Sequence, residues 1–178
     1  MRLVGEWAAP VVAQRVTLLF AFALMLTTLP APQLERPPIE TPIRGAALRA
    51  VLRDAHVATF GKAPSRARLS MAVAHVAFEG ADRSVAFALG GIDAAPGQVF
   101  TRWRNCRLVA HDDHASSARA YFRFMARRCG GALAAFDTGD PGRVADHLAV
   151  TKRDGTAGCA YHRLDTSIYS EQLRRLMR

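Results

Sequence analysis

The stretch SMAVAHVAFEGADRS, residues Ser70–Ser84, decides the fold of this chain. Its residues up to Phe78 are apolar on nearly every side of a helix, which is typical of a helix buried in the centre of a domain. Pro64 and Ser65 lie shortly before the stretch, and the Ser65 hydroxyl is suited to cap the first helical turn. The helix is predicted to end at Glu79, so an acidic side chain lies at the end of a buried element.

Glu79 has two interpretations. An ionised carboxylate is costly at the end of an apolar helix, so burial should raise its pKa, as a general acid working at neutral pH requires. Alternatively, Glu79 reaches solvent in the last turn and pairs with Arg83 four residues later. The residue pattern alone leaves both interpretations open.

The composition is that of a folded domain with a basic surface. The chain has 178 residues, of which 50% are hydrophobic, so it fits one domain plus an appendage. Its net charge of +9 favours an anionic partner such as nucleic acid, phospholipid or cell wall. Signatures of DNA- or RNA-binding modules, phosphate loops, dinucleotide folds and serine hydrolases are missing from the sequence. The three cysteines, Cys106, Cys129 and Cys159, lack CxxC spacing, and one bridge plus a free thiol is open to them.

The first forty residues form an appendage with its own character. Val16–Leu29 is an apolar run without charge, shorter than the roughly 20 residues of a spanning helix. It fits a cleaved secretion signal, an uncleaved membrane anchor, or a helix that docks against the domain or an assembly partner. The proline-rich Pro30–Pro42 predicts an extended linker. We therefore expect an apolar helix and linker in residues 1–42 and the functional domain in residues 43–178.

The rest of the chain predicts a mainly α fold. Apolar periodicity, capping residues and Gly61 indicate four further helices, which cover Arg44–Phe60, a basic amphipathic stretch from Ala115, a stretch starting at Asp140-Pro141, and a last one capped by Asp165 or Ser167. Ala81–Val109 is predicted as loop or short β-hairpin. The His111–His114 cluster, HDDH, resembles a metal site, but Asp113 as the cap of the helix that follows is the simpler explanation.

The order of segments along the chain resembles a known enzyme family. AVAHVAFEGADRS, FALGGIDA, VAHDDHASSARAYFRFM, GDPGRVADHL and the Gly158–Tyr169 segment follow one another as related segments do in the glucosaminidase domain of bacterial and phage peptidoglycan hydrolases. In that lysozyme-like family, a helix ending in A-x-x-A-x-E-[ST]-G-x-G-x-S delivers the catalytic acid. The resemblance covers about Ile43–Leu176 and implies a lysozyme-like helical domain.

The resemblance implies a set of site residues. Glu79 matches the general acid that protonates the glycosidic oxygen. The family also has an active-site tyrosine late in the domain; its position falls near Cys159 in this chain, and Tyr161 is the loose match to it. Ser84 matches the serine that closes the loop after the acid. Leu89, Gly90, Gly91 and Ile92 match the segment that lines the cleft, and Asp112 matches the residue that opens the helix carrying Tyr121.

The sequence also departs from the family pattern. Gly80–Arg83 replaces the Ser/Thr-Gly-x-Gly motif, and Ala86 and Ala88 replace asparagines. A second catalytic carboxylate is not assignable among Asp82, Asp93, Asp112 and Asp113.

Two functions follow as expectations. The first is a peptidoglycan hydrolase of the endo-β-N-acetylglucosaminidase or muramidase type, virion-associated or exported to the cell envelope, needing no metal or organic cofactor and binding no nucleic acid. The second is a catalytically degenerate domain that serves as a wall-binding or structural component of a phage tail or similar assembly. In either case residues 1–40 could engage a membrane or an assembly partner.

Overall fold

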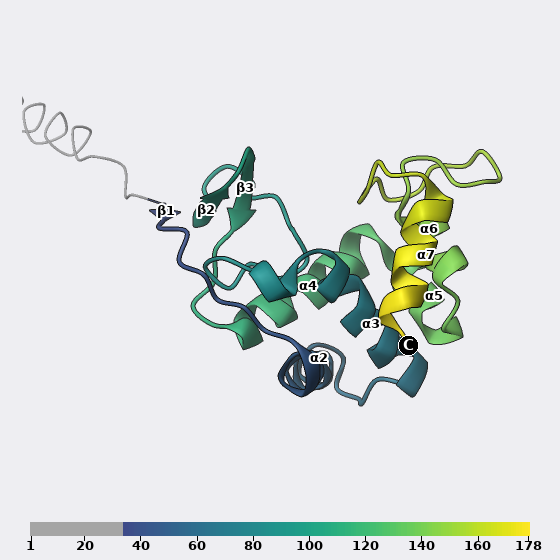
Figure 1. Cartoon of the computed structure of the whole chain (residues 1–178), viewed down its shortest axis with the longest axis horizontal. Coiled ribbons are helices and arrows are strands. Elements are labelled where there is room, and N and C mark those ends of the chain that lie inside the picture. The colour runs from purple at the N-terminus through teal and green to yellow at the C-terminus, as the bar shows by residue number, and fades with distance from the viewer. Residues whose placement is uncertain (1–33) are drawn as a thin grey trace, which may run out of the picture. The chain divides into compact units, whose positions relative to one another are not determined.

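The computed structural model describes residues 34–178, which form one compact unit. The predicted apolar helix around Val16–Leu29, with its three interpretations, lies outside the described residues. The compact unit contains six α-helices and one small three-stranded sheet, so the predicted mainly α fold class is confirmed for it (Figure 1). Within this unit, no helix has the length and apolar character that crossing a membrane requires.

The helices begin and end where local capping chemistry predicts. Ser65 caps α3 by accepting a hydrogen bond from the backbone N–H of Arg68, and Gly61 ends α2 in the left-handed conformation at φ +70°. Asp113, Asp140 and Asp165 cap α4, α6 and α7 through their carboxylates. The helices are α2 (Gly45–Phe60), α3 (Arg66–Phe78), α4 (His114–Arg128), α5 (Gly130–Ala135), α6 (Pro141–Leu148) and α7 (Thr166–Leu176).

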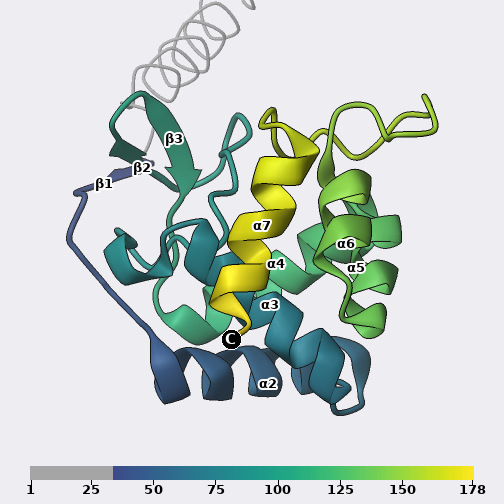
Figure 2. The same ribbon diagram turned by 45° about the vertical axis from the view of Figure 1, so that its right-hand side comes forward.

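Helix α3 is the central element. It packs against α2 and α7 (Figure 2) and against the short 3₁₀ turn Phe136–Thr138. Its residues Met71, Ala72 and Val76 are fully buried. Burial on several sides explains why its sequence is apolar all round. The central helix therefore fixes the position of the acid at its end, Glu79.

The small sheet lies on the side of the unit away from α5, α6 and α7 (Figures 1 and 2). Strand β2 (Phe100–Trp103) pairs antiparallel with β3 (Cys106–Val109), and β1 (Glu35–Arg36) pairs parallel with β2 on its other edge. The β2–β3 hairpin falls within the stretch that was predicted as loop or short β-hairpin. Strand β1 has no counterpart among the predicted elements.

Residues 34–42 fall in the predicted linker, yet they lie along the domain. Their extended backbone forms hydrogen bonds with the rest of the domain. The Thr41 N–H donates to the Ser84 carbonyl at 2.8 Å, and the Phe100 N–H donates to the Leu34 carbonyl at 2.8 Å. The imidazole of His114 contacts the Thr41 carbonyl at 2.8 Å. The compact unit therefore starts at Leu34.

Candidate active site

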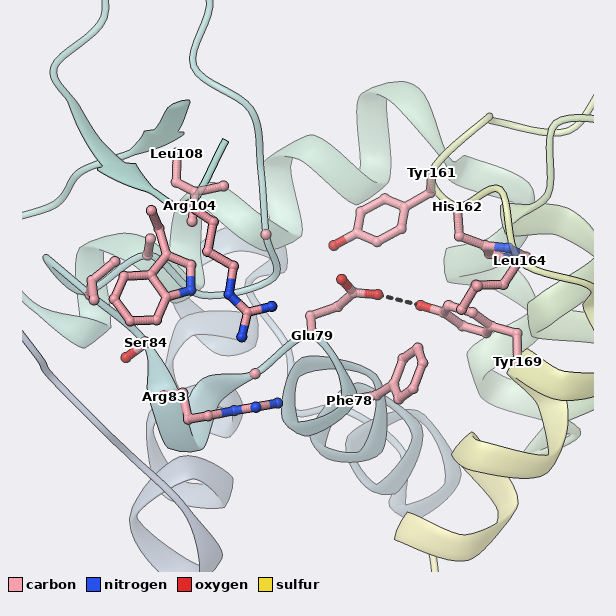
Figure 3. Close-up of a pocket in the computed structure, with 15 residues that line it drawn as sticks. Phe78, Glu79, Arg83, Ser84, Arg104, Leu108, Tyr161, His162, Leu164 and Tyr169 are labelled. Carbon is pink, nitrogen blue, oxygen red and sulfur yellow. Dashed lines mark hydrogen bonds between the residues drawn. The ribbon is translucent and has the colours of Figure 1, made fainter. Parts of the chain in front are cut away.

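Glu79 is the C-cap residue of α3, and its side chain enters a cavity of about 370 Å³. The cavity lies where the end of α3, the β2–β3 hairpin and the segment before α7 meet (Figure 3). The Tyr169 hydroxyl, on α7, donates a hydrogen bond to Oε1 of Glu79 at 2.6 Å. One carboxyl oxygen is thus held by α7.

The environment of Glu79 favours its protonated form. Burial raises the pKa of the Glu79 carboxyl, and the hydrogen bond from Tyr169 opposes that rise in part. Arg83 does not pair with Glu79; its ion pair is with Asp82, at 3.7 Å. The buried-acid interpretation of Glu79 therefore matches the structure, and the solvent-facing Glu79–Arg83 pair does not.

A glycine pair brings the backbone close to the acid. Gly90 and Gly91 have φ values of +74° and +57°, which favour glycine. A Cβ at Gly91 would lie 3.3 Å from Oε2 of Glu79, and a Cβ at Gly90 would lie 2.7 Å from the ring of Tyr121. The Leu89–Ile92 segment therefore runs directly beside Glu79, and a larger residue at either glycine would disturb the site.

A buried aromatic layer supports this segment from behind. The Tyr161 hydroxyl donates to the Gly90 carbonyl, and the Tyr121 hydroxyl contacts Nδ1 of His75 at 2.7 Å. Burial lowers the pKa of His75 to about 3, with a smaller contribution from His162, so His75 is neutral. The His162 ring stacks on Tyr169 with ring centres 3.9 Å apart. These contacts hold Tyr161 and Tyr169 in place in the cavity wall, next to the acid.

The structure gathers some of the predicted site residues and separates others. Glu79, Ser84, Gly91 and Tyr161 line the cavity, although the Ser84 hydroxyl donates to the Thr41 carbonyl and so anchors residues 34–42. The others lie elsewhere: Leu89, Gly90 and Tyr121 are buried behind the cavity, Ile92 packs against the core, and the exposed Asp112 pairs with Arg36 at 2.7 Å. Asp112 therefore contributes nothing to the cavity wall.

Several cavity residues were missed by sequence reasoning. Arg83, Trp103, Arg104 and His162 all line the cavity. Tyr169 lies on the predicted last helix, but the sequence gave no indication that Glu79 would be its partner. The prediction of loop or short β-hairpin for Ala81–Val109 covered the hairpin residues but carried no information about where the hairpin would fold.

The cavity wall carries more positive than negative side chains. Among the described residues that line it, Glu79 is the single carboxylate, whereas Arg83 and Arg104 are both cations. Asp82, Asp93, Asp112 and Asp113 are not part of its wall. Residues 34–178 contain no group of three or more His, Cys, Asp or Glu side chains placed to hold a metal ion.

The arrangement places a partly buried carboxyl of raised pKa beside two cations, which suits proton transfer to a ligand that is neutral or anionic. Comparison of this chain with family models, curated proteins and solved structures gave no match. The function of this chain is therefore inferred from the cavity and from the residues that line it.

Proposed function

We propose that this protein hydrolyses the glycan strands of peptidoglycan, with Glu79 as the general acid of a lysozyme-like helical domain. The observation that carries the proposal is the position of Glu79: a partly buried carboxyl with a raised pKa, at the end of the central helix, facing a cavity. A carboxylic acid that stays protonated near neutral pH is the group needed to protonate a glycosidic oxygen.

The two oxygens of Glu79 have different roles in this mechanism. Oε1 accepts the hydrogen bond from Tyr169, so Oε2, on the Gly91 side, is the oxygen that donates its proton to the leaving group. As the bond breaks, Glu79 becomes a carboxylate, and the Tyr169 hydrogen bond stabilises it. Tyr161 bounds the same space and contacts the sugar. With Glu79 as the single cavity carboxylate, the attacking group is water or the substrate's own acetamido oxygen.

The wall glycan as substrate is supported by charge and by the resemblance of the sequence. The chain carries a net charge of +9, and the cavity wall adds Arg83 and Arg104 beside the acid. An anionic wall polymer is attracted to such a surface. Virion association or export to the envelope, with a membrane or assembly partner for residues 1–40, belongs to the same proposal.

The test compares the full chain with two variants. Purified peptidoglycan is incubated with the wild type, with E79Q and with E171Q, and the released muropeptides are analysed by mass spectrometry. Glu171 is an exposed acid on α7 that pairs with Arg174 at 2.6 Å, so E171Q is a matched control. We expect release to fall by about 10²- to 10⁴-fold in E79Q, the usual contribution of a general acid, and to be unchanged in E171Q. Equal release by E79Q and the wild type would refute the proposal.

A second candidate function is a catalytically degenerate wall-binding component of a phage tail or similar assembly. The observation that favours it is the single carboxylate of the cavity. The same experiment separates the two functions. Wild-type protein that sediments with peptidoglycan and releases no product has the binding function alone, and product release removes this candidate.

A further inference from the structure

The wall of the cavity opposite Tyr169 carries two arginines. Arg83 comes from the 3₁₀ turn Ala81–Arg83 after Glu79, and Arg104 comes from the turn of the β2–β3 hairpin. Figure 3 shows both side chains on the side of Glu79 that faces away from Tyr169. Two elements that are remote in sequence therefore bring positive charge to one cavity.

Arg83 has one long ion pair, and Arg104 has none within the described residues. The single ion pair of Arg83 is the 3.7 Å contact with its neighbour Asp82, and the Arg83 side chain is 70% exposed. Arg104 makes no ion pair and no side-chain hydrogen bond with any residue of the described range 34–178. The cavity wall carries these two arginines and a single carboxylate, Glu79, so it has an excess of positive charge.

The backbone at Arg104 gives an independent indication. Trp103 ends β2 and Cys106 begins β3, so Arg104 is the first residue of a two-residue hairpin turn. Its φ is +53°, a conformation that such a turn normally gives to glycine. A non-glycine residue held in this region is strained, and strain of this kind clusters at functional sites.

Trp103, the residue before Arg104, also lines the cavity. Its indole offers an aromatic face against which a sugar ring can pack, while Arg104 offers a fork of N–H donors beside it. The hairpin therefore presents an apolar and a cationic contact side by side, at the same cavity as the acid.

We propose that Arg83 and Arg104 bind a carboxylate carried by the glycan next to the bond that Glu79 protonates, so that the site selects acidic over neutral glycans. Guanidinium groups bind carboxylates through paired, charge-assisted hydrogen bonds. In peptidoglycan the carboxylate comes from the lactyl group of the muramic residue or from its stem peptide. This inference rests on the proposed function and adds the feature of the substrate that the cavity recognises.

The test measures binding by calorimetry, using full-length E79Q because glutamine mimics the neutral acid and prevents turnover. Three probes are compared: the disaccharide of N-acetylglucosamine and N-acetylmuramic acid with a free lactyl carboxylate, the same disaccharide carrying a stem peptide, and the neutral disaccharide of N-acetylglucosamine. We expect at least one acidic probe to bind about tenfold or more tightly than the neutral one, as a charge-assisted hydrogen bond implies. The acidic probe that shows the preference identifies the source of the carboxylate.

Variants then assign the preference to the arginines. R83Q and R104G, each added to E79Q, should lower the affinity for the preferred acidic probe by about tenfold and leave the neutral probe unaffected. R107Q removes the same charge from the same hairpin, but Arg107 lies over the Phe100 ring at 4.0 Å, outside the cavity wall, so its affinities should match those of the parent. Because R104G also relieves the backbone strain, its melting temperature should be equal to or higher than that of the parent.

Two outcomes would overturn the inference: equal affinity for all three probes, or an acidic preference that persists in both R83Q and R104G. Its failure is distinguishable from failure of the proposed function. If the protein prefers acidic probes but the wild type does not hydrolyse the wall, only the proposed hydrolysis is refuted. If the wild type hydrolyses the wall but binds neutral and acidic probes equally, only the binding of a carboxylate by Arg83 and Arg104 is refuted.

Discussion

The position of Glu79 raises the pKa of its carboxyl. It lies at the C-terminal end of α3, where the helix dipole disfavours a negative charge, and burial adds to that effect. Tyr169 acts in the opposite direction, since its hydrogen bond stabilises the carboxylate. The balance is a carboxyl whose pKa is raised and whose conjugate base still has a partner.

This balance predicts a dependence of stability on pH. A carboxyl with a raised pKa binds its proton more tightly in the folded chain than in the unfolded one, so the free energy of unfolding falls as the pH rises from the usual glutamate pKa through the raised one. The glutamine side chain of E79Q cannot ionise. Relative to the wild type, E79Q should therefore be more stable at pH 8 than at pH 4, as measured by thermal denaturation. The same difference in melting temperature at both pH values would contradict this.

The Tyr169 hydrogen bond predicts a shift in the pH profile of hydrolysis. In Tyr169→Phe the carboxylate loses its donor, so the pKa of Glu79 rises further and the acid stays protonated to higher pH. The alkaline limb of the profile should move to higher pH, while the maximal rate falls by about tenfold because the product carboxylate is less stabilised. The rate of muropeptide release measured from pH 4 to pH 9 tests this. An alkaline limb that stays in place, or moves to lower pH, would count against the role of Tyr169.

At the scale of elements, the features that could be predicted depend on local chemistry. The caps at Ser65 and Asp113 bond to backbone groups within three residues, so the sequence alone indicates them. Helix α5 was missed because its sequence, GGALAA, has two glycines of low helix propensity; it forms because Ala132 and Leu133 pack into the core. Strand β1 was missed because its pairing partner, β2, lies far along the chain.

A disulfide links the end of α4 to the segment between α6 and α7. Cys129, at the end of α4, is bonded to Cys159, two residues before Tyr161, and the exposed Cys106 is free. The bridge therefore tethers the segment that supplies Tyr161 and His162 to the cavity. The sequence left the pairing open, because cysteine spacing without CxxC motifs does not specify partners.

Removing the bridge should destabilise the domain. For a loop of 30 residues, the chain-entropy model gives a loss of about 3.6 kcal/mol in C159S. The melting temperature should fall in C159S, and a reducing agent should lower it in the wild type as well. C106S, which changes the exposed thiol on the hairpin, serves as the control and should melt like the wild type. A C159S variant as stable as C106S would show that the bridge contributes nothing.

At the scale of the whole molecule, the candidate site was only partly predictable. Helical periodicity and the family resemblance placed Glu79 and Gly91 together, because both sit close to α3 in sequence and in space. Trp103 and Arg104 line the cavity because the β2–β3 hairpin packs next to the end of α3. This tertiary arrangement cannot be predicted from a local sequence pattern. Asp112 lies outside the cavity because the loop before α4 directs it to Arg36.

The packing of residues 34–43 predicts where the chain can be shortened. A chain that starts at Leu34 keeps β1 and the backbone hydrogen bonds to Ala81, Ser84 and Phe100, whereas a chain that starts at Arg44 loses them. The shorter chain also loses the buried Ile43. We expect it to be less stable by about 2 to 4 kcal/mol, which urea denaturation would measure. Equal stability of the two chains would mean that the segment is a linker after all.

The most direct test of the account is to titrate the Glu79 carboxyl itself. The side-chain carboxyl carbon of Glu79, assigned as the resonance that is missing in E79Q, is followed by NMR across the pH range in which the wild type hydrolyses peptidoglycan. The account predicts a midpoint above the ordinary glutamate value of 4.5 that coincides with the alkaline limb of hydrolysis. A midpoint at or below that value, or an alkaline limb that does not follow it, would contradict the assignment of Glu79 as the general acid.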